Sequence, residues 1–255
     1  MTEYRRILLD GASVQVVRDG DELVAGDGRR VAVAEAVHLP PCEPTKIVAV
    51  HLNHSSRVAE FGVRLPAAPT YFHKPVSALV GHGGAVIRPA NCKYLNYEGE
   101  VAIVIGKKAR KVPQSKVADH IWGVTTCVDW SIRDGDDNGN RTFRHAKNFD
   151  TSVSMGPSIV VGELDAQNQD METRLNGELR QQYNSKGMTY SFAEIVEFLS
   201  ANFTLFPGFV LSGGCGPGTA METGDPAKFL KPGDVVEYTS PRVGTLRNRI
   251  VAEED

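Results

Sequence analysis

Glycine and proline interrupt the apolar runs of this chain at short intervals from residue 46 onwards, so few segments are long enough to form a helix. Near the end of the chain, residues 205–210 and 230–235 repeat one device, in which a Pro-Gly turn leads into an apolar strand. Apolar residues recur at helical spacing after a capping-box pattern that begins at Ser191, and a shorter helix is expected from Ser115 to His120. We therefore expect a mainly β fold with few helices, in the α+β class.

The first 45 residues predict a small unit of their own. Valines and leucines alternate there with polar residues around Asp19-Gly20-Asp21 and Gly26-Asp27-Gly28, a pattern typical of β-hairpins. Prolines at positions 40, 41 and 44 predict a connector, because proline lacks an N–H donor and resists regular structure. We expect a small N-terminal β-rich annex over residues 1–45 and a main domain over residues 46–255.

Composition excludes several classes of partner. The chain has 255 residues, of which 41% are hydrophobic and 23% charged, which is ordinary for a soluble globular protein. A net charge of -3 is too weak to favour nucleic acid or an anionic membrane, and no run approaches the roughly 20 apolar residues of a membrane-spanning helix. The four cysteines form no Cys-x-x-Cys pair, which disfavours a disulfide scaffold or a zinc site. We expect a cytoplasmic enzyme or binding protein.

Two glutamates, Glu98 and Glu100, stand at the start of the most apolar run of the chain, which predicts a buried strand over residues 101–105. Side chains at positions i and i+2 of a strand point to the same face, so both carboxylates meet beside a hydrophobic wall. Burying an ionised carboxylate is unfavourable without a partner such as Arg, Lys or a divalent metal ion. Asp129 ends another apolar run and adds a third carboxylate at a strand end. The three residues together suggest a metal site.

A long polar segment follows Asp129, from Arg133 to Arg144, with Gly and Asn at its centre. Such a segment buries little surface and is expected to be a loop. Since it leaves from the candidate metal site, we interpret it as a lid.

Several blocks of the sequence stand in a characteristic order. The Glu-x-Glu block and the Asp-x-x-x-Arg-Asp block that starts at Asp129 are specific at this separation, whereas either alone would be weak. From roughly residue 46 to the end, the chain resembles the fumarylacetoacetate hydrolase superfamily, in particular small bacterial members similar to 2-hydroxyhepta-2,4-diene-1,7-dioate isomerase / 5-oxopent-3-ene-1,2,5-tricarboxylate decarboxylase. The blocks that carry the resemblance are residues 69–75, 97–107, 128–134, 147–150 and 176–181 and the two Pro-Gly strands.

This resemblance implies a catalytic domain of rolled, mixed β-sheets over residues 46–255, assembled as a homodimer. It also implies that Glu98, Glu100 and Asp129 hold Mg²⁺ or Mn²⁺, which agrees with the preference of hard cations for oxygen ligands. Substrates of the family are 2-oxo acids, and the metal stabilises the enolate formed when a bond to C3 breaks. By the same resemblance Lys147 contacts the substrate. Lys74 is balanced between the site and the surface, and Arg133 between a substrate clamp and a structural ion pair.

One departure from the family concerns activation of water. Many hydrolytic relatives carry a His and, three residues later, a Glu in the loop after the first core strand. Here Glu60 is kept, but the His position is Arg57, and arginine cannot act as a general base. Three explanations remain open: Glu60 acts with Arg57 orienting it, His54 or His145 substitutes, or no activated water is needed. In the last case Arg57 can pair with a second carboxylate of a dioate substrate.

A second departure lies at Gly213 and Gly214, where the family usually has Thr-Gly-Thr-Pro across the turn. Gly214 removes a hydroxyl that contacts substrate, although the backbone N–H groups of such a turn can form an anion-binding nest. Both glycines are therefore candidate substrate-binding residues, and a flexible turn is the alternative.

The function expected from these features is that of a divalent-metal-dependent enzyme acting on a C–C bond next to a 2-oxo acid. We place hydrolysis of an acylpyruvate-type substrate first. The alternative is an isomerase or decarboxylase of a 2-oxo or 2-hydroxy-diene dioate in aromatic catabolism. A second alternative is a non-catalytic relative that binds a keto acid.

Overall fold

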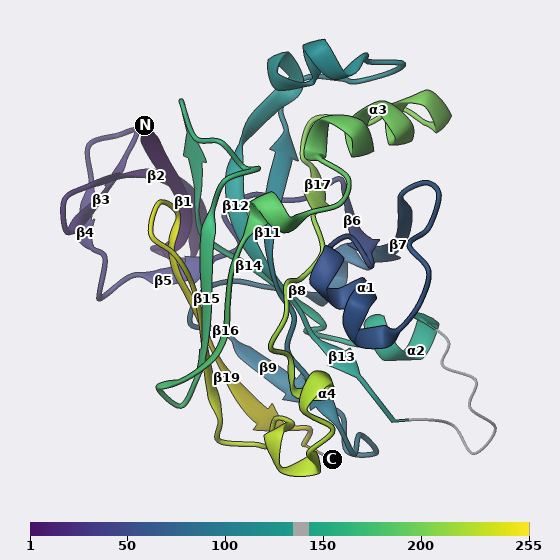
Figure 1. Ribbon diagram of the computed structural model, residues 1–255. Coiled ribbons are helices and arrows are strands. Elements are labelled where there is room, and N and C mark those ends of the chain that lie inside the picture. The colour runs from purple at the N-terminus through teal and green to yellow at the C-terminus, as the bar shows by residue number, and fades with distance from the viewer. Residues whose placement is uncertain (135–142, 255) are drawn as a thin grey trace.

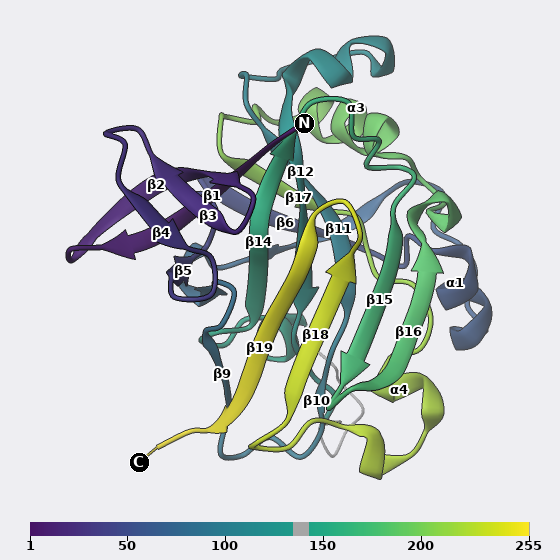
Figure 2. The ribbon, with the colours of Figure 1, turned by 90° about the vertical axis from the view of Figure 1, so that its left-hand side faces the viewer.

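Two β-sheets, one large and one smaller, carry most of the chain (Figures 1 and 2). The structure is a computed structural model, and it describes residues 1–134 and 143–254 apart from the side chains of residues 60, 61, 143 and 144. Within these residues the expectation of a mainly β fold with few helices is confirmed. Most of the segment interpreted as a lid, residues 135–142, lies outside the described residues.

The large sheet is mixed. Its strands are β1 (Thr2–Leu9), β2 (Ala12–Asp19), β3 (Glu22–Ala25), β4 (Arg30–Ala32), β5 (Val37–Leu39), β6 (Lys46–His51), β7 (Thr70–Lys74), β8 (Leu79–Val80), β11 (Gly99–Ile105), β12 (Ile121–Asp129), β14 (Val153–Val161) and β17 (Phe209–Ser212). They follow the order β4-β3-β2-β1-β14-β12-β11-β17-β6-β7, with β5 on β1 and β8 on β14. Because β11 and β12 are antiparallel neighbours, the start of β11 lies beside the end of β12.

A smaller sheet packs on one face of the large one. It contains one of the two strands that follow a Pro-Gly turn. Its strands, in spatial order, are β16 (Glu178–Asn184), β15 (Asp170–Leu175), β18 (Val235–Ser240), β19 (Gly244–Ala252) and β9 (Ala85–Arg88). The Pro-Gly turn at residues 232–233 leads into β18 of this sheet, whereas the turn at 207–208 leads into β17 of the large sheet. A separate pair is formed by β10 (Leu95–Asn96) and β13 (Ser131–Ile132).

The helices are short and lie at the edges of the sheets. The predicted helix is α3 (Phe192–Asn202), and its capping box is present, with Ser191 and Glu194 bonded reciprocally. The segment expected as a helix near residue 115 is a 3-10 helix, in which Val117 is the buried residue. No described helix is long and apolar enough to cross a membrane. The others are α1 (Ser55–Phe61), α2 (Phe143–Lys147), α4 (Ala220–Thr223) and the 3-10 helices η1 (Val76–Ala78), η2 (Gln114–His120), η3 (Ser185–Gly187) and η4 (Pro226–Lys228).

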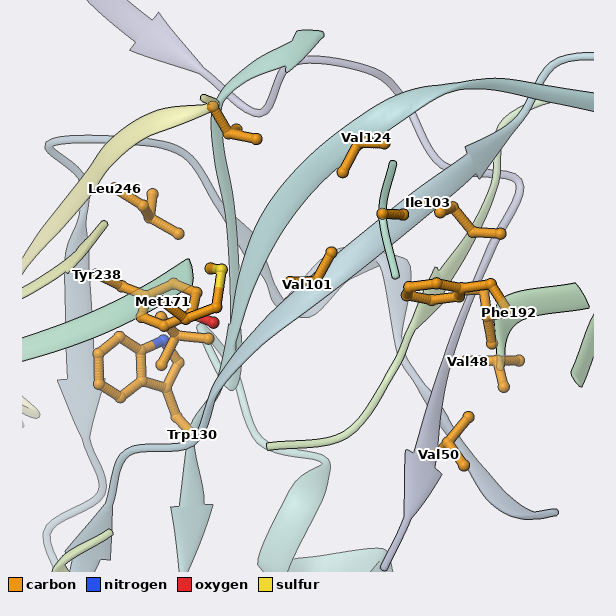
Figure 3. Packing of buried hydrophobic residues seen from close by; sticks show 14 of the residues in the cluster. Val48, Val50, Val101, Ile103, Val124, Trp130, Met171, Phe192, Tyr238 and Leu246 are labelled. Carbon is orange, nitrogen blue, oxygen red and sulfur yellow. The ribbon is translucent and has the colours of Figure 1, made fainter. Parts of the chain in front are cut away.

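The hydrophobic core lies on both faces of the central strands. All seven residues of β11 are buried. Val101 and Ile103 point into the space between the two sheets, where Figure 3 shows them with Tyr238 and Leu246 of the smaller sheet. Their neighbours in β11 face the other way, into a second cluster that contains Ala102, Val104, Ile47, Met155 and Val210. Residues with even numbers in β11 therefore share the face that is turned away from the smaller sheet.

The N-terminal strands extend the large sheet. Strand β1 pairs antiparallel with β14 and with β2, and β3 pairs with β2; strands β2 and β3 stand to one side of the smaller sheet (Figure 2). A small core of their own is formed by Ile7, Val16, Leu23 and Ala25. The boundary between an annex and a main domain at residues 45 and 46 stays a prediction.

Candidate active site

Three carboxylates meet at one end of the β11–β12 pair. The backbone N–H of Asp129 donates to the carbonyl of Glu98 at 2.8 Å, and Glu100 lies opposite Cys127 in the register. Residues directly opposite each other in an antiparallel pair project to the same face. Glu98, Glu100 and Asp129 therefore share the face turned away from the smaller sheet, with exposed fractions of 4%, 2% and 3%.

The glycine between the two glutamates has a steric reason. Gly99 faces the smaller sheet, and a Cβ at this position would overlap the ring of Tyr238. The ring is itself fully buried and its hydroxyl is bonded to that of Tyr183 at 2.9 Å. The Glu-Gly-Glu sequence thus combines two acidic side chains on one face with a close approach of an aromatic ring on the other.

Cationic side chains from distant segments converge on these carboxylates. Nζ of Lys147, at the end of α2, lies 2.6 Å from Oε2 of Glu98 and also contacts Oδ2 of Asp129. Nζ of Lys74, at the end of β7, lies 2.7 Å from Oδ1 of Asp129, and Arg133 contacts Oε1 of Glu98. The structure thus brings together all three predicted metal ligands and the three predicted cationic residues Lys147, Lys74 and Arg133.

The electrostatics of the two glutamates differ. Burial alone would raise the pKa of Glu98, but Arg133 and Lys147 reverse this effect and hold its pKa well below the usual range. Burial raises the pKa of Glu100 to about 8, and the negative charges of Asp129 and Glu98 add to the shift. Among the described residues, the hydrogen bonds to Glu100 come from the hydroxyl of Ser212 and the N–H of Gly214, both neutral groups.

This donor set fits a divalent cation. Three buried carboxylates offer the oxygen ligands that Mg²⁺ and Mn²⁺ take, and Glu100 lacks an ion pair among the described residues. The carboxylates open onto a cavity of about 50 Å³, enough for a metal ion. The lining residues are Val50, His51, Leu52, Arg57, Phe72, Glu98, Glu100, Asp129, Arg133, Lys147 and Cys215.

Arg57 reaches the cavity from α1 and is held by the segment around α4. Its guanidinium donates to Oγ1 of Thr219 at 3.1 Å and forms an ion pair with Glu222. Glu222 also accepts the N–H of Gly218. Arg57 is therefore a fixed cationic wall of the cavity, and its neighbour Glu60 has a side chain outside the described residues.

Neither of the histidines proposed as substitutes lines the cavity. Nδ1 of His54 lies 2.7 Å from the hydroxyl of Ser56, and its ring packs edge-on against Tyr183. His145 is exposed on α2. A structural role for His54 follows, because its ring is engaged at the base of α1.

Two lining residues with side chains able to do chemistry, His51 and Cys215, were not predicted from the sequence. His51 is the last residue of β6 and lines the cavity. Asp129 was identified as a polar residue at the end of a strand, and the same signal would have indicated His51. Burial, together with the charge of Lys147, lowers the pKa of His51. Cys215 follows β17, and no local pattern predicts which strand β17 joins.

The glycine-rich turn after β17 uses its backbone N–H groups within the protein. The N–H of Gly213 donates to the carbonyl of Val101 at 2.9 Å, and that of Gly214 donates to Oε2 of Glu100 at 3.1 Å. These contacts brace Glu100, and the substrate-binding role of the two glycines stays a prediction.

Comparisons with known proteins show which chains are similar to this one in sequence and fold. The crystal structure of 5-carboxymethyl-2-hydroxymuconate delta-isomerase from Mycobacterium smegmatis superposes with a TM-score of 0.87 at 30% identity, covering 99% of this chain and 100% of that chain. Oxaloacetate tautomerase Fahd2a, mitochondrial, from Rattus norvegicus is 33% identical over 214 residues, or 83% of this chain and 68% of that protein. The homoprotocatechuate catabolism bifunctional isomerase/decarboxylase of Escherichia coli is 33% identical over 230 residues, or 89% and 52%.

A family model described as the fumarylacetoacetate (FAA) hydrolase C-terminal domain matches residues 46–251. The match covers the strands that carry all three carboxylates and the loop with Cys215. The resemblance seen in the sequence is confirmed, and the chain belongs to the fumarylacetoacetate hydrolase family.

Proposed function

We propose that this protein isomerises a 2-oxo dicarboxylic acid, or its 2-hydroxy-diene form, by moving a proton, with a divalent cation held by Glu98, Glu100 and Asp129. The observation that carries the proposal is the place of Arg57. It lines the cavity, and its guanidinium is bound by Thr219 and Glu222. By the family resemblance, many hydrolytic relatives have a water-activating His at this position. An arginine does not take a proton from water at working pH.

This proposal reverses the order of the two functions expected from the sequence. Hydrolysis of an acylpyruvate came first there, and isomerase or decarboxylase chemistry was the alternative. The relatives compared above are named as an isomerase, a tautomerase and a bifunctional isomerase/decarboxylase. The names of these relatives and the position of Arg57 both favour isomerase or decarboxylase chemistry. Decarboxylation remains a second candidate because the Escherichia coli relative carries both activities in its name.

A bound Mg²⁺ or Mn²⁺ would supply a Lewis acid that favours the enolate form of a 2-oxo acid. Lys147 and Arg133 lie against the metal-binding carboxylates, so both are in position to bind the first carboxylate of a substrate in the cavity. Arg57 offers its guanidinium on another wall of the same cavity, where it can bind a second carboxylate. The cavity of about 50 Å³ is too small to enclose a dicarboxylic acid, so it would have to widen for the substrate to be oriented between these cationic side chains.

The proton needs an acceptor that is uncharged or anionic. The lowered pKa of His51 keeps its ring neutral near pH 7, so it can accept a proton from C3 and return it. Glu60 is the acceptor expected from the sequence. Variants distinguish the two candidate acceptors. We expect both His51→Asn and Glu60→Gln to keep metal binding. The variant that removes the true proton acceptor should lose turnover by about 100- to 10,000-fold.

Mass spectrometry of the products tests the proposal directly. Incubation of the full chain and Mg²⁺ or Mn²⁺ with a panel of 2-oxo dicarboxylic acids and acylpyruvates should give isomerisation, with no change in mass and a change in ultraviolet absorption. Loss of CO₂ would support the second candidate, and gain of water would restore hydrolysis. Tight binding of the panel without any turnover would contradict an enzymatic role and favour the keto-acid-binding alternative.

A further inference from the structure

Arg57 forms an ion pair with a carboxylate that lies outside the cavity wall. The arginine is 4% exposed and lines the cavity, whereas its partner Glu222 stands outside the described lining. Lys147 and Arg133 differ, because both contact Glu98, which is itself part of the wall. A charge from beyond the wall thus offsets that of Arg57.

The carboxylate of Glu222 is held in place by its own segment. It accepts the N–H of Gly218, four residues earlier in the chain. Thr219, which is fully buried at the start of α4, accepts from the same guanidinium through Oγ1 at 3.1 Å. These contacts connect α1, which carries Arg57, to the segment around α4.

The α4 segment also reaches the carboxylate end of the cavity. The N–H of Met221 donates to Oδ1 of Asn96 at 3.3 Å, and Nδ2 of Asn96 donates to Oε1 of Glu98 at 3.1 Å. Asn96 is fully buried, so water does not compete for these bonds. The segment therefore contacts the cavity at both its carboxylate end and its Arg57 end.

The two members of the ion pair differ in their access to solvent. The side chain of Glu222 is 14% exposed, against 4% for Arg57, and residues 223–227 that follow it are exposed. A carboxylate at this place regains hydration when it turns outward, whereas the guanidinium left behind stays buried without an anion. Separation of the pair is therefore favourable when another anion reaches Arg57 from the cavity.

The size of the cavity gives this separation a role. A volume of about 50 Å³ does not enclose a dicarboxylic acid, and the ion pair joins α1 to α4 on one side of that space. Movement of Glu222 away from Arg57 removes this connection and lets the cavity widen.

We propose that Glu222 makes this site specific for dicarboxylic acids by occupying Arg57 until a second carboxylate replaces it. The proposal rests on the proposed function for the role of Arg57, and it assigns Glu222 as a positioning residue. An acid with one carboxylate binds at Lys147 and Arg133 and leaves the ion pair intact, so the cavity stays narrow. An acid with two carboxylates displaces Glu222, and the cavity widens around it.

Calorimetric titration of the full chain with Mg²⁺ tests the proposal. The probes are 2-oxoglutarate and 2-oxopentanoate, which have the same carbon chain and differ in the second carboxylate. Glu222→Gln removes the charge but keeps an acceptor for the N–H of Gly218. Its affinity for 2-oxoglutarate should rise roughly 10-fold, the scale of a charge-assisted hydrogen bond, and that for 2-oxopentanoate should stay the same. Glu178→Gln, an exposed carboxylate paired with Arg180, is the matched control and should change neither.

An Arg57→Gln background shows whether Glu222 acts through Arg57. There Glu222→Gln should change neither affinity, because the group for which the two carboxylates compete is gone. A merely structural role of Glu222 does not distinguish the two acids. An equal change for both acids in Glu222→Gln, or a gain that persists without Arg57, would overturn the proposal.

The outcomes separate this proposal from the proposed function. Equal affinity for the two acids in wild type and in Glu222→Gln would contradict both, since Arg57 would then bind no second carboxylate. A preference for 2-oxoglutarate that requires Arg57 but does not rise in Glu222→Gln would overturn this proposal alone. If Glu222→Gln does not fold, hydrogen exchange of the wild-type chain decides. Residues 218–223 should exchange faster with 2-oxoglutarate than with 2-oxopentanoate, and equal exchange would contradict the proposal.

Discussion

The two faces of the β11–β12 pair meet opposite kinds of neighbours. On one face, Val101 and Ile103 pack against the smaller sheet in a closed apolar core. On the other, Glu98 and Glu100 of the same segment meet Lys147 and the cavity. Alternation along a strand separates these two environments by a single residue. One pair of strands thus supplies stability on one face and a candidate site for chemistry on the other.

The charged face depends on the apolar face. Carboxylates buried at 4% exposure or less lose hydration, and only a rigid frame can hold the cations that compensate them. The frame is provided by strands whose opposite faces are fully packed, as in Ile103 and Val124 (Figure 3). A change confined to one face should therefore affect one property of the protein and spare the other.

The largest effect is expected on the charged face, from Glu98→Gln. Removing one carboxylate should lower metal affinity by more than about 100-fold, since even groups that only support a ligand cost roughly 10- to 100-fold. Turnover at fixed metal concentration should fall with it. Glu237→Gln, on the surface of the smaller sheet, is the matched control and should change neither. Unaltered metal affinity in Glu98→Gln would remove this residue from the ligand set.

The apolar face should respond in the opposite way. Ile103 is fully buried between the sheets, so Ile103→Ala should lower the free energy of unfolding by about 2 to 5 kcal/mol. Ile103→Val should cost about 0.5 to 1.5 kcal/mol. Denaturant titration gives these values, and metal titration below the unfolding transition should give the wild-type affinity. A loss of affinity in folded Ile103→Val would show that the two faces are coupled.

At Gly99, a single substitution should affect both faces of the β11–β12 pair. An added methyl group collides with Tyr238 on the apolar side and displaces the backbone that carries both glutamates on the other. We expect Gly99→Ala to lower stability by about 1 to 3 kcal/mol, as overpacking does, and to weaken metal binding as well. The double variant with Tyr238→Ala should recover part of the metal affinity. Normal stability and affinity in Gly99→Ala would mean that the ring yields without moving the strand.

The smallest effect concerns a histidine remote from the site. Burial and the nearby His38 lower the pKa of His82 to about 4, and its Nδ1 accepts the N–H of Arg247 at 3.2 Å. The unfolded chain therefore binds a proton near pH 6.5 that the folded chain binds only near pH 4, and stability falls as pH drops through this window. We expect at most about 1 kcal/mol per pH unit. Denaturant midpoints for wild type and His82→Asn should converge toward pH 4; parallel curves would contradict the assignment.

Local sequence patterns predicted the features that depend on residues close together along the chain. The capping box at Ser191 and the shared face of Glu98 and Glu100 follow from periods of 3.6 and 2 residues and hold in the structure. The short helix α1 was not predicted, because its seven residues carry no apolar stripe and no side chain caps its start.

The positions of the other site residues depend on pairing between strands that are far apart in the sequence. Cys215 reaches the carboxylates only because β17 lies beside β11, which nothing in its own segment indicates. Lys74 and Lys147 were proposed from the resemblance, and their convergence on Asp129 follows from the pairing of β6 with β7 and from the return of the chain through α2.

Equilibrium dialysis against Mn²⁺ shows whether the carboxylates of this face hold a metal ion. The wild-type chain should bind about one ion per chain, as a single site with carboxylate ligands requires. The double variant Glu98→Gln/Glu100→Gln, confirmed as folded by circular dichroism, should bind none at the same concentration. Equal Mn²⁺ occupancy in the two proteins would contradict the account, because the carboxylates on this face of β11 would then have no part in holding the metal.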